Sequence, residues 1–239
     1  MASITGKEVP DARLLLVGEI PRIIASVKDA GAAKAMAQGL RDAGLAAFVC
    51  GDSELRSRSV GLAAHVVIFR DGAALFRDRP GREVSVEPGD VFLILRGRVK
   101  SAAQETISTT KMTLNVPATV LAGGIPIVRQ VTRKATRESF RAEDFVRIFD
   151  RRSPDPRVEM FQNRLDYTFL GPDLSPSAPA NFEILVRKLR QWFPLAIFDD
   201  RLTRASKADV PVAGPEERLE VNGKLIYLGY LAIARMAQP

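Results

Sequence analysis

Apolar residues recur at helical spacing in two stretches of the chain. In residues 30–43 the apolar positions lie three or four residues apart, and Gly44 follows as a residue suited to end a helix. Residues 180–193 carry a longer pattern that forms one continuous apolar face. Its members are Phe182, Leu185, Val186, Leu189, Trp192 and Phe193. The spacing predicts a helix over each stretch.

Short apolar runs bounded by turn-forming residues predict β-strands elsewhere. The runs lie at 13–20, 45–50 and 63–70, within 82–99 around Pro88-Gly89, within 118–132 around Gly123-Gly124, and within 157–171 around Gln162-Asn163. In residues 218–227 the pair Asn222-Gly223 suits a type I′ turn, because both residues tolerate positive φ. That stretch therefore predicts a β-hairpin.

Residues 139–153 predict a helix with a highly charged polar face. The apolar positions 142, 145, 146 and 149 follow helical spacing, and Ser139 is a favourable N-cap residue. Pro154 would end the helix, since proline does not continue one. A further helical stretch is expected over residues 196–205.

This order of elements predicts an α+β protein with two domains. The first, residues 12–100, is a small sheet-plus-helix unit that a split β-α-β sandwich of ferredoxin-like type would fit. Residues 101–116 are polar and poor in large apolar groups, which predicts a linker or mobile loop. Residues 117–239 form the second domain, a mixed unit of strands and amphipathic helices.

The composition is that of a soluble globular protein, with 239 residues, 46% of them apolar and 26% charged. A single cysteine, Cys50, excludes an internal disulfide and favours a reducing compartment, so a cytoplasmic location is expected. The N-terminal stretch lacks the pattern of a signal peptide, and no window has the roughly 18 apolar residues of a membrane span. The apolar segment 225–236 is shorter and predicts buried core or an interface.

Residues that carry catalysis or bind metals are sparse. One histidine, His65, and Cys50 fall short of the roughly four ligands of a zinc site, and no glycine-rich phosphate motif is present. His65 is expected at a strand position, and Cys50 as a small buried residue. Asp199 and Asp200 are carboxylates that a metal could use, but local pairing with Arg201 is the favoured interpretation. We expect no catalytic group, no cofactor and no metal.

The net charge of +7 arises from 35 basic and 28 acidic residues. Basic residues are densest just upstream of the predicted helix at 139–153, and these are the candidate residues for binding a polyanion. They are Arg129, Arg133, Lys134, Arg137 and Arg141. A basic excess of this size also arises from biased composition without any polyanionic partner.

Three classes of function remain. The leading one is a cytoplasmic, non-catalytic binding or regulatory module that acts through contacts with a protein partner or with itself. The two amphipathic helices and the apolar segment 225–236 favour it. The alternative is a nucleic-acid-binding protein that uses the basic region 129–152. The third is an enzyme that works through carboxylates such as Asp199 and Asp200.

Overall fold

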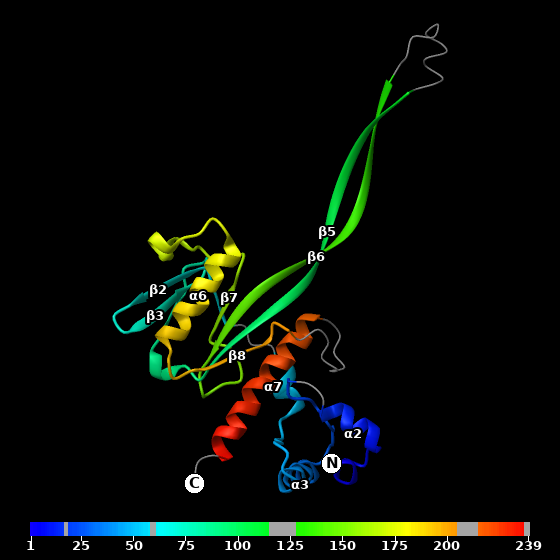
Figure 1. Cartoon of the computed structure of the whole chain (residues 1–239), viewed down its shortest axis with the longest axis vertical. Coiled ribbons are helices and arrows are strands. Elements are labelled where there is room, and N and C mark those ends of the chain that lie inside the picture. The colour runs from blue at the N-terminus through cyan, green and yellow to red at the C-terminus, as the bar shows by residue number, and fades with distance from the viewer. Residues whose placement is uncertain (17–18, 58–60, 115–127, 205–214, 237–239) are drawn as a thin grey trace. The chain divides into compact units, whose positions relative to one another are not determined.

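The computed structural model describes residues 1–16, 19–57, 61–114, 128–204 and 215–236 (Figure 1). It contains helices and two β-sheets, which confirms the α+β class. The chain divides into two units, which we name the compact unit, Met1–Val99 with Glu143–Pro239, and the ribbon, Lys100–Ala142. These boundaries differ from the predicted domains 12–100 and 117–239, because strands from both halves of the sequence join one sheet.

A five-stranded sheet with the order β1-β7-β6-β5-β8 forms the centre of the compact unit. The strands are β1 (Leu62–Ala64), β5 (Leu93–Leu114), β6 (Val128–Phe149), β7 (Val158–Phe161) and β8 (Ile197–Leu202). β1 pairs with β7 in parallel, β7 with β6 in antiparallel, and β5 with β8 in parallel. Gly61 precedes β1 where a Cβ atom would lie 2.5 Å from the carbonyl oxygen of Pro156, so only glycine allows this approach.

A second sheet is the antiparallel meander β2 (Val66–Arg70), β3 (Ala73–Arg77) and β4 (Glu83–Val86). Asp71 and Gly72 form the turn between β2 and β3, both with positive φ. The short 3-10 helix η1 (Pro88–Asp90) then leads into β5. These elements confirm the strands predicted at 63–70 and the two predicted within 82–99. In the described residues no strand precedes α3 (Ala30–Asp42), and the next element after it is the helix α4, which differs from the β-α-β unit of a ferredoxin-like domain.

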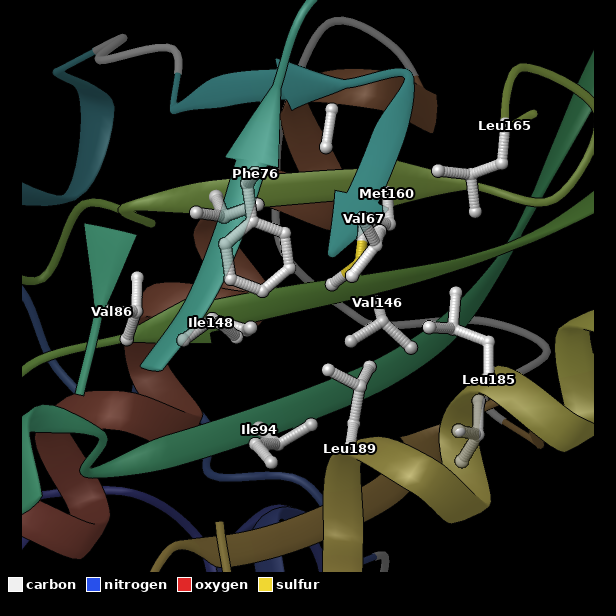
Figure 2. Packing of buried hydrophobic residues seen from close by; sticks show 14 of the residues in the cluster. Val67, Phe76, Val86, Ile94, Val146, Ile148, Met160, Leu165, Leu185 and Leu189 are labelled. Carbon is white, nitrogen blue, oxygen red and sulfur yellow. The ribbon is translucent and has the colours of Figure 1, made fainter. Parts of the chain in front are cut away.

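The larger hydrophobic core lies on one face of the five-stranded sheet. Helix α6 (Ala178–Trp192) contributes Phe182, Leu185, Val186 and Leu189 to it. The three-stranded sheet contributes Val67, Phe76 and Val86, and Figure 2 shows several of these side chains around Ile94, Val146, Ile148 and Met160. The helix predicted at 180–193 is therefore confirmed, with its apolar face buried as its spacing requires.

The opposite face of the sheet is covered by α7 (Pro215–Met236). Leu93, Leu95, Phe145 and Phe149 of the sheet form a cluster with Ile226 and Tyr227 of the helix. Gly97 in β5 lies against Phe145 and Leu202 so closely that a Cβ atom would overlap both side chains. Both faces of the central strands are thus buried, which explains why their sequences are not simply alternating.

The N-terminal region consists of α1 (Ala2–Thr5), α2 (Val9–Leu16), α3 and α4 (Asp52–Arg56). The prediction at 30–43 is confirmed: Asp29 caps α3 by accepting a hydrogen bond from the Ala32 N–H at 2.6 Å, and Gly44 follows with φ 79°. The strand predicted at 13–20 is wrong, since residues 9–16 are helical. Pro10 is compatible with the first turn of a helix, and leucine is a strong helix former. Residues 45–50 form no strand.

Two larger predictions are also wrong. Residues 139–149 belong to β6, not to a helix, because apolar positions buried on both faces of a central strand mimic helical spacing. Residues 218–227 belong to α7, not to a hairpin. Glycine within a helix costs about 1 kcal/mol. Burying Val221, Leu225, Ile226 and Tyr227 stabilises the helix by about 1.5–3 kcal/mol each.

The remaining elements follow the predictions in part. β7 lies within the strand prediction at 157–171, and η2 (Thr168–Asp173) follows it. β8 occupies 197–202, where a helix was expected. The predicted linker 101–116 is a continuation of β5 as far as Leu114, and the turn predicted at Gly123-Gly124 lies outside the described residues. No helix in the described part of the chain combines the length and apolarity needed to cross a bilayer.

Candidate nucleic-acid interface

Basic side chains of the compact unit are largely neutralised by nearby acids. Ion pairs within 4 Å involve Arg56, Arg70, Arg77, Arg82, Arg96, Arg98, Arg147, Arg157, Arg164, Lys188, Arg201, Arg204 and Lys224. By sequence, this unit holds 28 basic and 26 acidic residues, a net charge of +2. Its basic and acidic residues are therefore nearly balanced, and several arginines, such as Arg96 and Arg147, connect its own elements.

Asp144 of β6 shows how closely this neutralisation is arranged. Its carboxylate is 6% exposed and accepts hydrogen bonds from Arg98 Nε at 2.5 Å and Arg96 Nη2 at 2.8 Å. Arg96 also reaches Glu183 of α6 at 3.0 Å. Burial alone would raise the pKa of the Asp144 carboxyl, but the two arginines outweigh it and hold that pKa below its usual value. One acid thus holds two basic residues of β5.

Arg147 lies within the predicted nucleic-acid region 129–152 but is buried in the compact unit, with a side chain only 4% exposed. Its Nε lies 2.7 Å from the Glu159 carboxylate on β7, and its guanidinium also contacts Glu220 of α7. Burial raises the pKa of the Glu159 carboxyl, which Arg147 partly opposes. Arg151 lies over the ring of Phe92, 4.7 Å from its centroid. Arg147 is therefore removed from the candidate interface, whereas Arg151 and Arg152 are exposed.

The ribbon has a different balance of charge. Residues 100–142 contain seven basic and two acidic residues, so a net +5 of the chain's +7 resides there. All five predicted polyanion-binding residues lie on β6 within this unit: Arg129, Arg133, Lys134, Arg137 and Arg141. Two acids cannot neutralise seven bases, whatever the pairing.

The spacing of the arginines along β6 is regular. Positions 129, 133, 137 and 141 are four residues apart along the strand. At about 3.3 Å per residue, neighbouring positions are about 13 Å apart and the outer two about 40 Å apart. The fourfold spacing is visible in the sequence, but its extent was not, because the same positions on a helix would extend over only about 18 Å.

Lys100 and Lys111 belong to the same unit and were not among the predicted site residues. They lie on β5, the strand next to β6 in the sheet order. The prediction of a linker at 101–116 separated them from the arginines of β6. A sequence prediction of two long adjacent strands would have placed these two lysines beside the arginines of β6.

The other candidate residues, His65 and Asp199, contact nearby groups of the fold. His65 lies between β1 and β2, and its Nδ1 is 2.6 Å from the carbonyl oxygen of Arg164. Asp199 pairs with Arg201, whose Nε lies 2.8 Å from its carboxylate, as expected, although on a strand. Among the residues that the structure describes, no three His, Cys, Asp or Glu side chains gather as a metal site would require.

Two cavities lie in the N-terminal region of the compact unit, with volumes of ≈ 320 and ≈ 260 Å³; the larger is lined mainly by apolar groups and the smaller about equally by polar and apolar groups. Segments 20–27 and 46–50 line them, together with α3 and α7. Cys50 lines the smaller cavity and is half-buried, less than expected, and burial raises the pKa of its thiol. Ile23, Val27, Val49, Ile233 and Met236 are exposed around them.

Comparison with protein-family models, with curated proteins and with solved structures finds no match for this chain. The residues that bear on its function are therefore identified by their own chemistry. The two features that stand out are the basic ribbon and the two cavities with their exposed apolar rim.

Proposed function

We propose that this chain binds nucleic acid, and specifically duplex DNA, through its ribbon. The observation that carries the proposal is the concentration of net charge +5 in 43 residues, with four arginines at every fourth position along β6. Duplex DNA carries one negative charge per about 1.7 Å of axis, and basic side chains that replace its counterions give affinity without requiring a base sequence.

The dimensions of the ribbon favour a duplex over a single strand. The four arginine positions extend over about 40 Å, slightly more than the 34–36 Å of one helical turn. Single-stranded binding relies on aromatic stacking, and residues 100–142 contain one aromatic residue, Phe140.

Fluorescence anisotropy with a labelled 24-base-pair duplex, at salt concentrations from 50 to 200 mM, tests the proposal. Replacing Arg133 and Arg137 by glutamine removes two phosphate contacts, so the slope of log K against log salt should become less negative by about 1.8. The matched control is Arg79→Gln with Arg187→Gln, two exposed arginines of the compact unit. The control should leave the slope unchanged.

The absence of salt-dependent binding by the wild-type protein would overturn the proposal. So would an equal loss of affinity in the control variant, because binding would then depend on total charge and not on the ribbon. A preference for single-stranded DNA of the same length would overturn the assignment of a duplex.

We also propose a second function, contact with a protein partner through the apolar rim of the N-terminal cavities. Ile23, Val27 and Val49 are exposed there. Residues 23–27 are extended chain without helix or strand, and they line the smaller cavity. A regulatory role in the cytoplasm is proposed on this basis and on the single cysteine.

The second function is tested by isolating the tagged protein from its own cells and identifying the proteins that accompany it. Ile23→Asp with Val49→Asp should remove a specific partner. Leu195→Asp is the matched control, because Leu195 is 84% exposed and does not line the cavities. Identical sets of accompanying proteins for both variants would contradict this function.

A further inference from the structure

The strands of the ribbon have edges that no other described strand covers. β5 and β6 each contain 22 residues, whereas β7 and β8 contain four and six. All four residues of β7 pair with residues 145–148 of β6, and β8 pairs with residues 93–97 of β5. Among the described strands, β5 beyond Gly97 and β6 before Phe145 therefore have only each other as neighbours.

Open edges of this length are unusual. About 15 residues of each strand are involved, or roughly 50 Å, where a typical strand has five or six residues. An isolated two-stranded ribbon is only marginally stable in water. Its outer N–H and C=O groups form a ready template for a further strand, unless charge, proline or a bulge prevents pairing.

The two edges differ in how they are protected. Residues 128–142 of β6 hold five basic residues and one acid, so two copies of this strand side by side would repel each other. Residues 101–110 of β5 hold one charged residue, Glu105, and no proline. This stretch also contains four residues of high strand propensity, Thr106, Ile107, Thr109 and Thr110. The β5 edge is thus extended and nearly uncharged.

We propose that β5 pairs with β5 of a second copy of this chain. A twofold axis would run between the two strands, so that the same surface is used by both copies. The pairing is antiparallel and gives a four-stranded sheet of the order β6-β5-β5-β6. The two arginine-rich β6 strands then occupy the outer edges, where their like charges are farthest apart. The ribbon is stabilised by the second pair of strands that an isolated hairpin lacks.

Matched pairs of threonines allow the proposal to be tested by light scattering on the full chain without nucleic acid. Thr106 and Thr110 on β5 are four residues apart, as are Thr132 and Thr136 on β6. Thr106→Arg with Thr110→Arg gives the β5 edge a repulsion like that of β6. The wild-type protein should show twice the mass of 26.2 kDa, and the β5 variant should dimerise at least tenfold more weakly. The β6 variant, Thr132→Arg with Thr136→Arg, should dimerise as the wild type does.

Cysteine scanning provides a second measurement that does not depend on charge. In a Cys50→Ser background, single cysteines are placed in turn at residues 101–110 and at residues 130–139. Directly opposed residues of antiparallel strands lie about 4.5–5.5 Å apart between Cα atoms, within reach of a disulfide. Oxidation should link two chains at one or two neighbouring β5 positions and at no β6 position.

A monomeric wild-type protein would overturn the proposal. So would a dimer that only the β6 variant weakens, or crosslinks that form at β6 and not at β5. Circular dichroism of each variant shows whether its fold is retained. Because these measurements contain no DNA, their failure is distinct from failure of the proposed DNA binding.

Discussion

The compact unit and the ribbon use basic residues in opposite ways. In the compact unit 28 bases face 26 acids, and arginines such as Arg96 and Arg147 join β-strands to helices. In the ribbon seven bases accompany two acids. The net charge of the whole chain, a modest +7, conceals this difference. An excess of positive charge is evidence for a polyanionic partner only if the basic residues that pair with acids of the same chain are not counted.

Substitution of Arg147 should have the largest effect on stability, and it tests whether the basic residues of the compact unit stabilise the fold. Arg147→Met leaves the buried Glu159 carboxylate without its partner and should lower the free energy of unfolding by about 3–5 kcal/mol. The pKa of Glu159 is already raised by burial, so the protonated acid is tolerated and the loss should grow as pH rises. Urea denaturation at pH 5 and pH 8 measures both effects.

The double variant Arg147→Met with Glu159→Leu is the control for this experiment. It removes both fully buried charges and should recover most of the lost stability, because only the partly exposed Glu220 then lacks its arginine. If the single and double variants were equally stable, the unpaired Glu159 carboxylate would not be the cause of the lost stability.

Asp144 gives the next largest effect. Asp144→Asn weakens the hydrogen bonds to Arg96 and Arg98 and should cost about 1.5–3 kcal/mol at neutral pH. The pKa of Asp144 is lowered in the folded protein, so its contribution is complete above about pH 4 and is lost as pH falls through the folded value. The difference in Tm from the wild type should therefore shrink in acid. Asp173→Asn, at a half-exposed pair with Lys188, should change stability by less than about 1 kcal/mol.

Gly223 tests the helix that replaced the predicted hairpin. A Cβ atom there would lie 3.4 Å from Leu95 Cδ2 and 3.6 Å from Arg147 Nη1, both ordinary contacts. Gly223→Ala should therefore raise the free energy of unfolding by about 0.5–1 kcal/mol through helix propensity. A hairpin with a type I′ turn at this position would instead be destabilised. Gly97→Ala is the contrasting change, which should destabilise the protein by about 1–3 kcal/mol because Phe145 and Leu202 leave no space.

The ribbon arginines should have the smallest effect on stability. Arg133→Gln with Arg137→Gln should change the free energy of unfolding by less than about 0.5 kcal/mol, as for surface substitutions, while DNA binding becomes less dependent on salt. A large loss of stability, measured by the same urea titration, would mean that these arginines are paired within the fold and that the two units do not differ as described.

Local patterns predicted α3 and α6 well, because each helix buries a single face and ends at a recognisable residue. Phe182, Leu185 and Leu189 are all buried as their spacing requires. The same rule failed at residues 139–149, where β6 is buried on both faces and its apolar residues fit either period. The choice between helix and strand depends on the position of β6 between β5 and β7, which is a property of the whole sheet.

The predicted polyanion-binding site was likewise predictable in its residue types but not in its geometry. The basic residues of 129–141 were evident from composition, and their common strand was not. Asn222 and Gly223 carry a strong local signal for a turn, but Asn222 is buried within α7 beside a cluster of apolar side chains. Chemistry that depends on residue type was therefore predictable, whereas its geometry depended on contacts between distant segments.

The strand order of the five-stranded sheet constrains how a newly made chain folds. β1 pairs with β7, which is synthesised about ninety residues later, and β5 pairs with β8 after a similar interval. The first hundred residues leave the ribosome with the future partners of both strands still unmade. Their apolar faces must stay accessible until α7 emerges, so this chain should depend on chaperones during translation more than a protein whose sheet joins neighbouring strands.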